Sequence, residues 1–251
     1  MNLPPPVHCG ERVDDLLIGG LRIIQRPEEF CFTLDSVLLA QFAFLRAGAS
    51  AVDLGSGSGA IALLLAARGA TVTGVELNPR LADMAERSVR LNQLEARVAI
   101  HCHDLRRISD FLPAGSFSLV VSNPPYRASG RGQLNPCQTV ASARHELTAT
   151  LADVIAAARY LVKYRGRFAL VQLPERMAEI LKTMSDAGLE PKRLRLVYPY
   201  QDAKPKFLLV EGIRGARPGL DVLPPLFVYS APGVYSREIM EYYQAEGVSM
   251  R

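Results

Sequence analysis

The chain has 251 residues, of which 49% are hydrophobic and 22% are charged. This composition is typical of folded globular proteins and argues against a mainly disordered chain. No apolar run approaches the ~20 residues that a membrane-spanning helix needs. The first six residues lack the basic and apolar segments of a secretory signal, so we expect a cytoplasmic protein with no membrane partner.

Basic residues are concentrated in the second half of the chain. Residues 1–122 hold 11 Lys and Arg against 13 Asp and Glu, whereas residues 123–251 hold 18 against 12. Of the 29 basic residues, 24 are Arg, and guanidinium groups bind phosphate through paired hydrogen bonds. The second half therefore suits a phosphate-bearing partner, although a solvated surface rich in arginine fits the charge equally well.

The cysteines and histidines do not show the spacing of a metal site. Cys9, Cys31, Cys102 and Cys137 form no C-x-x-C pair, which argues against zinc and against a disulfide framework. We expect buried or incidental thiols. Residues 101–104 (HCHD) look like ligands, but alternate residues of a strand face opposite sides, so we expect no metal there.

The first elements of the chain are predicted to be a hairpin and a helix. Two apolar stretches, at residues 15–18 and 21–24, flank a Gly-Gly pair that can form a two-residue turn. Asp35 is expected to cap the helix that follows, which extends to Leu45 with apolar residues at helical spacing.

After Gly48, strands and helices alternate, a pattern typical of βαβ units and a mostly parallel sheet. Strands are expected at residues 51–54, 71–76, 98–101, 117–122, 167–173, 192–198 and 206–211. Helices are expected at 61–68, 78–92, 105–111, 148–164 and 175–187. The last two strands should pair antiparallel because their connection is too short for a crossover helix. Residues 123–146 read as a long loop, and the tail has a weak strand at 226–229 and a short helix at 237–243.

A glycine-rich loop follows the strand at residues 51–54. Asp53 precedes Gly55, Gly57 and Gly59 at a strand-to-helix junction, and Glu76 ends the next strand. Glycines allow the backbone to approach a ligand closely, and an acid at the end of the second strand can accept both hydroxyls of a ribose. The loop fits the dinucleotide fingerprint, but Asp53 would place a carboxylate beside a pyrophosphate, which favours S-adenosylmethionine.

The motif Asn123-Pro124-Pro125-Tyr126 follows the fourth strand, at the sheet edge that carries the glycine loop. The prolines stiffen the turn. The Asn side-chain oxygen and a Pro carbonyl can accept both hydrogens of a planar amine, and the Tyr ring offers a face on which a flipped base can stack. On the sequence alone, the ring of Tyr126 is expected to matter and its hydroxyl is not.

These two motifs together resemble those of methyltransferases that act on amide or exocyclic amine nitrogens. Within that group, residues 12–245 resemble the bacterial tRNA1(Val) N6-adenine methyltransferases. Further likeness lies in residues 32–39 (FTLDSVLL), 144–146 (RHE) and 208–212 (LLVEG). The resemblance implies a Rossmann-like α/β fold with a seven-stranded, mostly parallel sheet, an antiparallel last strand and helices on both faces. It also implies a hairpin and cofactor-closing helix at 1–48, a catalytic domain at 49–212 and a C-terminal extension at 213–251 in the same globule.

The resemblance implies a role for each motif residue. Asn123, Pro124 and Tyr126 would hold the target base, and Asp104 would contact the cofactor adenine unless it only caps a helix. Cofactor contacts are expected from Thr33, Asp35, Asp53, Gly55, Gly57, Gly59, Glu76, Leu77, Asp104, Leu105 and Asn123. Arg127, Arg131 and Arg144 are candidates for contacts to the phosphates of RNA, expected to be a tRNA methylated at the adenosine beside its anticodon.

Three other functions remain open at this point. A protein glutamine-N5 methyltransferase would use the same amide clamp, but that family usually carries a helical N-terminal domain. A guanine-N2 methyltransferase of ribosomal RNA is a second possibility, and a catalytically silent RNA-binding module is a third. The presence of Asp53, Glu76 and Asn123 together argues against the silent module.

Overall fold

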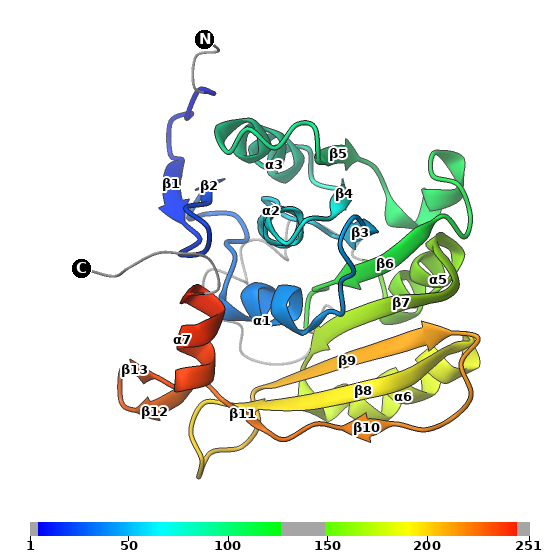
Figure 1. Ribbon diagram of the computed structural model, residues 1–251. Helices are drawn as coiled ribbons and strands as arrows, with labels where there is room; N and C mark the ends of the chain where they lie inside the picture. Colours follow the sequence, from blue (N-terminus) through cyan, green and yellow to red (C-terminus); the bar gives the residue numbers. More distant parts are fainter. Residues whose placement is uncertain (1–4, 127–148, 245–251) are drawn as a thin grey trace.

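The computed structural model describes residues 5–126 and 149–244, which form a central sheet with helices on its two faces (Figure 1). Within these residues the sheet has nine strands. From one edge to the other they are β5 (Val98–Cys102), β4 (Thr71–Glu76), β3 (Ser50–Leu54), β6 (Phe117–Ser122), β7 (Val162–Gln172), β9 (Phe207–Arg214), β8 (Leu189–Tyr198) and β10 (Asp221–Val222), with β11 (Leu226–Phe227) also paired to β8.

The direction of the strands agrees with the sequence prediction, but their number does not. β9 is antiparallel to β7 and β8, and the other pairs are parallel. The expectation of seven strands is wrong because β10 and β11 join the edge beside β8. Each has only two residues, which is too short for an alternating pattern to be visible in the sequence.

Helices cover both faces of the sheet, as predicted (Figure 1). The helices of one face are α1 (Leu34–Phe42), α2 (Ala60–Ala67) and α3 (Pro79–Leu91), and those of the other are α5 (Leu151–Leu161) and α6 (Met177–Asp186). Strand β3 contributes side chains to both faces. Ala51 packs in the core under α1, α2 and α3, whereas Val52 and Leu54 pack in the core under α5 and α6. Two short 3-10 helices, Leu105–Asp110 and Pro174–Arg176, precede β6 and α6.

Local signals account for several helix ends. Asn78 caps α3 by accepting a hydrogen bond from the Arg80 amide at 3.0 Å, and Pro79 takes the first helical position. Thr150 and Asp153 form a reciprocal capping box at the start of α5. The helix predicted to run to residue 164 ends at Leu161, because Val162 already pairs with Phe117 as the start of β7.

The predicted hairpin and its Gly-Gly turn are confirmed, and only the strand boundaries differ. The strands are β1 (Arg12–Asp15) and β2 (Arg22–Gln25). The Leu21 amide donates to the Ile18 carbonyl at 3.0 Å across Gly19 and Gly20, whose φ angles are 59° and 66°. Leu16, Ile18 and Leu21 lie in the core beside this turn.

Helix α1 starts two residues earlier and ends three residues sooner than expected. Its N-cap residue is Thr33, and Asp35 lies inside the first turn with only 1% of its surface exposed. The predicted capping role of Asp35 is therefore wrong. A buried carboxylate needs hydrogen-bond partners, and these are described with the site.

The C-terminal residues pack beside α1 (Figure 1). They form a small hairpin of β12 (Tyr229–Ala231) and β13 (Val234–Tyr235) followed by α7 (Arg237–Gln244), which confirms the predicted short helix. An ion pair between Arg195 and Glu238 ties α7 to β8. Among the residues described, no helix combines the length and apolar character needed to cross a membrane.

Candidate active site

The sheet topology brings the predicted motifs to one edge. β3, β4, β5 and β6 are parallel neighbours, so their carboxyl ends meet at the same side of the sheet. The glycine loop follows β3, Glu76 ends β4, Asp104 lies shortly after β5 and Asn123 follows β6. Ligands of open α/β sheets bind at such carboxyl ends, so this edge is the candidate site.

The glycine loop needs glycine at each of its three positions. Gly55, Gly57 and Gly59 have φ angles of 74°, 55° and 94°, a region that side chains disfavour. A Cβ on Gly59 would lie 3.2 Å from the Cβ of Ala85 in α3, whereas one on Gly55 would meet no atom of the described residues within 4 Å. The loop is thus packed against α3 on one side and open to a ligand on the other.

Glu76 holds the glycine loop in place. Its carboxylate accepts hydrogen bonds from the backbone amides of Gly57 and Asn78, each at 2.8 Å. The structure therefore gives Glu76 a role in shaping the loop. Contact of the same carboxylate with a ribose stays a prediction.

Asp53 lies beneath the loop and is fully buried. Neither carboxyl oxygen has a hydrogen-bond partner among the residues described. Burial, assisted by the nearby charge of Glu76, raises the pKa of Asp53 to about 8. The carboxyl group therefore carries a proton at neutral pH, which removes the repulsion between it and Glu76.

A pocket lies directly at the glycine loop and joins it to the segment before α1. One wall is the loop, and the opposite wall carries aromatic rings and the Ser36 hydroxyl. The lining residues are Phe30, Phe32, Ser36, Gly55, Ser56, Gly57, Ser58, Ala60, Ile61 and Asn123. The position of Phe30 and Phe32 agrees with the expectation that this segment closes over a cofactor. The enclosed space is only about 20 Å³, so the segment that carries Phe30 and Phe32 has to move outward before a ligand as large as S-adenosylmethionine can enter.

The acceptor motif borders the same pocket through Asn123. Its Nδ2 donates to the Ser36 hydroxyl at 3.3 Å, and its Oδ1 accepts no hydrogen bond from the residues that the structure describes. The Pro125 carbonyl accepts from Gln172 at 3.4 Å. The Pro124 carbonyl has no hydrogen-bond partner within the described part of the chain. Asn123 thus offers its oxygen at the pocket, whereas Pro124 is buried and its part in holding an amine stays a prediction.

Tyr126 is bound through its hydroxyl, a contact that the sequence analysis missed. The hydroxyl donates to Asp35, which also accepts from the Thr33 hydroxyl and, at 2.8 Å, from the Ser36 amide. The Tyr126 ring lies 5.8 Å from that of Phe207, between ring centroids. Thr33 and Asp35, expected as cofactor contacts, thus support the acceptor motif. One sequence feature pointed toward this arrangement: Ser36 lies next to Asp35 in the segment of residues 32–39.

The residues expected around the cofactor adenine are only partly explained by the structure. Asp104 caps the 3-10 helix and pairs with Arg106 at 2.5 Å, which lowers the pKa of its carboxyl group. The capping role is confirmed, and contact with adenine stays a prediction. Leu77 is 43% exposed beside Glu76, and Leu105 is half-buried. Arg127, Arg131 and Arg144 lie outside the described residues.

The structure also bears on the predictions for the cysteines and for residues 101–104 (HCHD). Cys9 and Cys102 are exposed and Cys31 is partly exposed, so none of these three thiols is fully buried, and that of Cys31 donates to the Arg26 carbonyl at 3.4 Å. Cys137 lies outside the described residues. His103 stacks on Phe111 with ring centroids 4.3 Å apart, so it has a structural partner.

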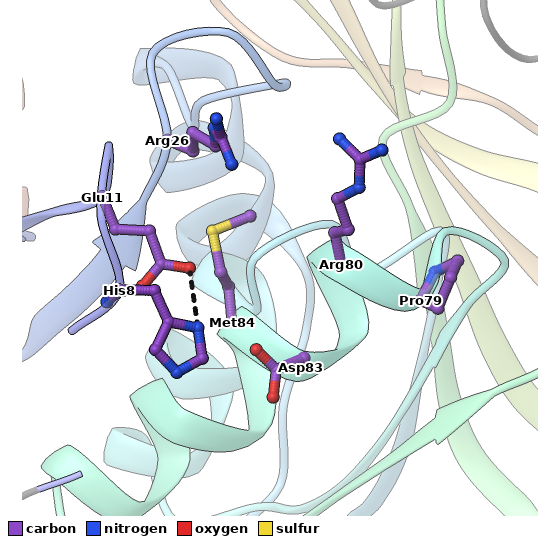
Figure 2. Close-up of a pocket in the computed structure, with 7 residues that line it drawn as sticks. All are labelled: His8, Glu11, Arg26, Pro79, Arg80, Asp83 and Met84. Carbon is purple, nitrogen blue, oxygen red and sulfur yellow. Dashed lines mark hydrogen bonds and ion pairs between the residues drawn. The ribbon is translucent and has the colours of Figure 1, made fainter. Parts of the chain in front are cut away.

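A second pocket lies between the N-terminal segment and α3, away from the glycine loop, and Figure 2 shows its lining. His8, Glu11 and Asp83 place potential ligand atoms within 4.8 Å of one another. However, Glu11 and Asp83 both pair at 2.6 Å with Arg87, which is 2% exposed. The two carboxylates neutralise this buried guanidinium, and these ion pairs hold the N-terminal segment against α3.

Comparison with known proteins also indicates a methyltransferase. The methyltransferase small domain family matches residues 33–175. A protein from Porphyromonas gingivalis named tRNA1(Val) (adenine(37)-N6)-methyltransferase is 32% identical over 215 residues, which cover 81% of this chain and 83% of that protein.

Solved structures support the fold. A predicted O-methyltransferase from Agrobacterium tumefaciens has a TM-score of 0.69 at 23% identity, covering 86% of this chain and 99% of that one. A geranyl diphosphate C-methyltransferase from Streptomyces coelicolor, solved with S-adenosyl-L-homocysteine, has a TM-score of 0.55 at 16% identity, covering 72% and 80%. The chain has the Rossmann-like fold of these enzymes and belongs to the methyltransferase small domain family of S-adenosylmethionine-dependent methyltransferases, together with proteins named tRNA1(Val) N6-adenine methyltransferases.

Proposed function

We propose that the protein methylates the N6 amine of an adenine in RNA, with adenosine 37 of tRNA1(Val) as its target. The observation that carries this proposal is the Asn123 amide. It borders the pocket at the glycine loop, and its Nδ2 is engaged by Ser36, so its oxygen is left to accept from an amine. An amine held there lies beside the cofactor pocket.

The residues of the chain would act mainly by positioning. Bound S-adenosylmethionine supplies an activated methyl group. Asn123 Oδ1 and the Pro124 carbonyl would each accept one hydrogen of the amine, which turns the nitrogen lone pair toward the pocket. The Tyr126 ring would support the flipped base. No strong base is needed, because the nitrogen proton becomes acidic once the nitrogen is methylated and can pass to water.

Contacts to the cofactor follow from the same edge of the sheet. We propose that the Glu76 carboxylate binds the ribose hydroxyls, that Leu77 packs beside the adenine and that Asp104 reaches the adenine amine. Each of these side chains lies at or just after the carboxyl end of a parallel strand. The orphaned, protonated Asp53 stays beneath the loop in this proposal.

Two observations support RNA as the substrate class. Residues 123–251 carry an excess of basic residues, 18 against 12 acidic, and a relative that matches most of the chain carries a tRNA methyltransferase name. Phosphate contacts make binding strongly dependent on salt. Arg127, Arg131 and Arg144 remain proposed phosphate ligands.

The experiment offers the purified protein four potential substrates with methyl-labelled cofactor. These are unmodified tRNA1(Val), the same tRNA with guanosine at position 37, ribosomal RNA and a peptide release factor. Label in N6-methyladenosine of the first tRNA alone is the expected result. Label in the release factor or in guanine would refute the proposal, as would RNA affinity that stays constant between about 50 and 200 mM salt.

A further inference from the structure

Four tyrosines at the C-terminal end of the chain form one continuous row of ring contacts, of which the first two are stacked and the third is tilted. Ring centroids are 5.3 Å apart for Tyr200 and Tyr229, 5.2 Å for Tyr229 and Tyr235, and 5.7 Å for Tyr235 and Tyr243. The rings come from the loop after β8, from β12, from β13 and from α7. We call these four residues the tyrosine stack. Offset rings at such distances attract one another, so the stack holds four separate elements in one arrangement.

Tyr200 is the end of the stack that faces solvent. It is 39% exposed, whereas the other three rings are partly buried and pack on the core that contains α1. Among the residues described, Tyr229 is the one aromatic partner of Tyr200. The Tyr200 ring therefore contacts Tyr229 on one side and remains partly open to solvent.

The position of Tyr200 relates it to the candidate active site. β8 is antiparallel to β9 and β9 is antiparallel to β7, so β8 ends at the same sheet edge as β6 and β7. The loop at residues 199–206 starts with β8 at this edge and leads to Phe207, whose ring contacts Tyr126 of the acceptor motif. A strand of RNA whose adenine reaches Tyr126 would pass this loop with its neighbouring nucleotides.

The loop also carries charge suited to a nucleic acid. Lys204 and Lys206 are exposed, and Lys206 lies 5.5 Å from the Phe207 ring centre. Asp202 is the single acidic residue between 199 and 206. The nearby carboxylates of α7, Glu238 and Glu241, are neutralised by Arg195 and Arg237. Exposed aromatic rings with neighbouring lysines are the typical elements of single-stranded nucleic-acid binding.

We propose that Tyr200 is a stacking platform for a nucleotide adjacent to the methylated adenosine, and that Lys204 and Lys206 bind the neighbouring phosphates. This inference rests on the proposed function in RNA methylation. The tyrosine stack keeps the Tyr200 ring in place, so less conformational freedom is lost when a base binds. The loop would thus capture the unpaired nucleotides that flank the flipped adenine.

The first test is the steady-state kinetics of Tyr200→Ala on unmodified tRNA1(Val). We expect KM for the tRNA to rise about 10-fold, because one base-stacking contact is lost. The value of kcat at saturating tRNA and the affinity for S-adenosylmethionine should stay within about twofold. Tyr200→Phe, which keeps the ring, should behave as the wild type. The matched control is Tyr164→Ala, which removes an exposed tyrosine at the amino end of β7.

A second readout reports stacking directly and does not respond to a purely structural role. The tRNA carries 2-aminopurine at position 36 or 38, and its fluorescence is measured on binding. We expect quenching at one of the two positions by the wild type and by Tyr200→Phe, and its loss with Tyr200→Ala. Quenching at neither position, or quenching that persists with Tyr200→Ala, would overturn the inference.

The lysines provide a test that does not depend on Tyr200. The double variant Lys204→Ala/Lys206→Ala should lower the slope of log affinity against log salt by about 1–2. Lys163→Ala, an exposed lysine at the amino end of β7, should leave the slope unchanged. A slope unchanged in the double variant would refute the phosphate contacts.

Different results would refute the Tyr200 stacking platform and the proposed function in RNA methylation. If the wild type methylates tRNA1(Val) and Tyr200→Ala has an unchanged KM, the platform is wrong and the proposed function stands. If the wild type methylates a protein and no RNA, the proposed function is wrong and the platform falls with it.

Discussion

Replacing Tyr126 with phenylalanine removes a single oxygen atom and keeps the aromatic ring. From the sequence alone this change should have little effect, since only the ring was expected to act. The structure predicts otherwise, because the Tyr126 hydroxyl donates to the carboxylate of Asp35. The variant therefore separates stacking by the ring from positioning by the hydroxyl.

The size of the effect follows from the surroundings of Asp35. This carboxylate is 1% exposed, and its three donors are the Thr33 hydroxyl, the Ser36 amide and the Tyr126 hydroxyl. Without Tyr126 as donor, Oδ2 has no hydrogen-bond partner among the described residues. A hydrogen bond to a charged group contributes about 1.5–3 kcal/mol. We expect a loss of this size, divided between the free energy of unfolding and the rate of methyl transfer.

The assay combines urea unfolding with single-turnover methyl transfer to the tRNA. Tyr126→Phe should lose about 1 kcal/mol or more of stability, about 10-fold or more in rate, or a combination that adds up to the expected total. Asp35→Asn and the double variant complete a double-mutant cycle, which isolates the interaction between the two side chains. Tyr164→Phe is the control, since its ring is 70% exposed. If both stability and rate of Tyr126→Phe match the wild type, the hydroxyl contact does not position the acceptor motif.

Three further predictions follow from the site. Asn123→Ala should lower kcat by ~100-fold or more while the affinity for S-adenosylmethionine changes little, because the amine is no longer held in line; a rate above a tenth of the wild type would refute this. Glu76→Ala should weaken cofactor binding, measured by calorimetry, by about 2 kcal/mol, through loss of charge-assisted hydrogen bonds. Glu76→Ala also removes the hydrogen bond that the Gly57 amide donates to the Glu76 carboxylate. Glu76→Gln keeps an oxygen that can accept this bond, so it serves as the milder comparison. Burial raises the pKa of Asp53 from 3.8 to about 8, so its contribution to stability is present in full below about pH 4 and is lost as the pH rises toward 8. The stability of Asp53→Asn relative to the wild type should therefore grow by about 1 kcal/mol per pH unit between about 5 and 8, and a constant difference in urea unfolding would contradict the raised pKa.

Local signals predicted the parts of the fold in which neighbouring residues decide the conformation. Asn78 and Pro79 start α3 as expected because capping and a fixed φ act within one turn. The Gly-Gly turn between β1 and β2 was predicted in the same way, because two glycines with positive φ are enough to close it. The strand boundaries beside it could not be predicted locally, since Leu16, Ile18 and Leu21 are buried in a core supplied by distant helices.

The same distinction applies to the site. Glu76 and Asn123 could be predicted because Glu76 ends one strand and Asn123 follows another, and parallel strands bring such positions together whatever their side chains are. The Asp35–Tyr126 contact joins residues 91 positions apart and has no local signature. Asp35 also fits the pattern of a helix cap, and only its burial and its contact with Tyr126 distinguish its actual role from capping.

The segment at the start of α1 links the two halves of the site. Ser36 lines the pocket at the glycine loop and also fixes the amide of Asn123, while its neighbour Asp35 holds Tyr126. A ligand that fills this pocket therefore touches the same short segment that orients the acceptor residues. Because both Asn123 and Tyr126 depend on one helical turn, a small displacement of that turn would misalign amine and ring together. The geometry needed for transfer is thus set by hydrogen bonds from α1 as much as by the stiffness of the two prolines.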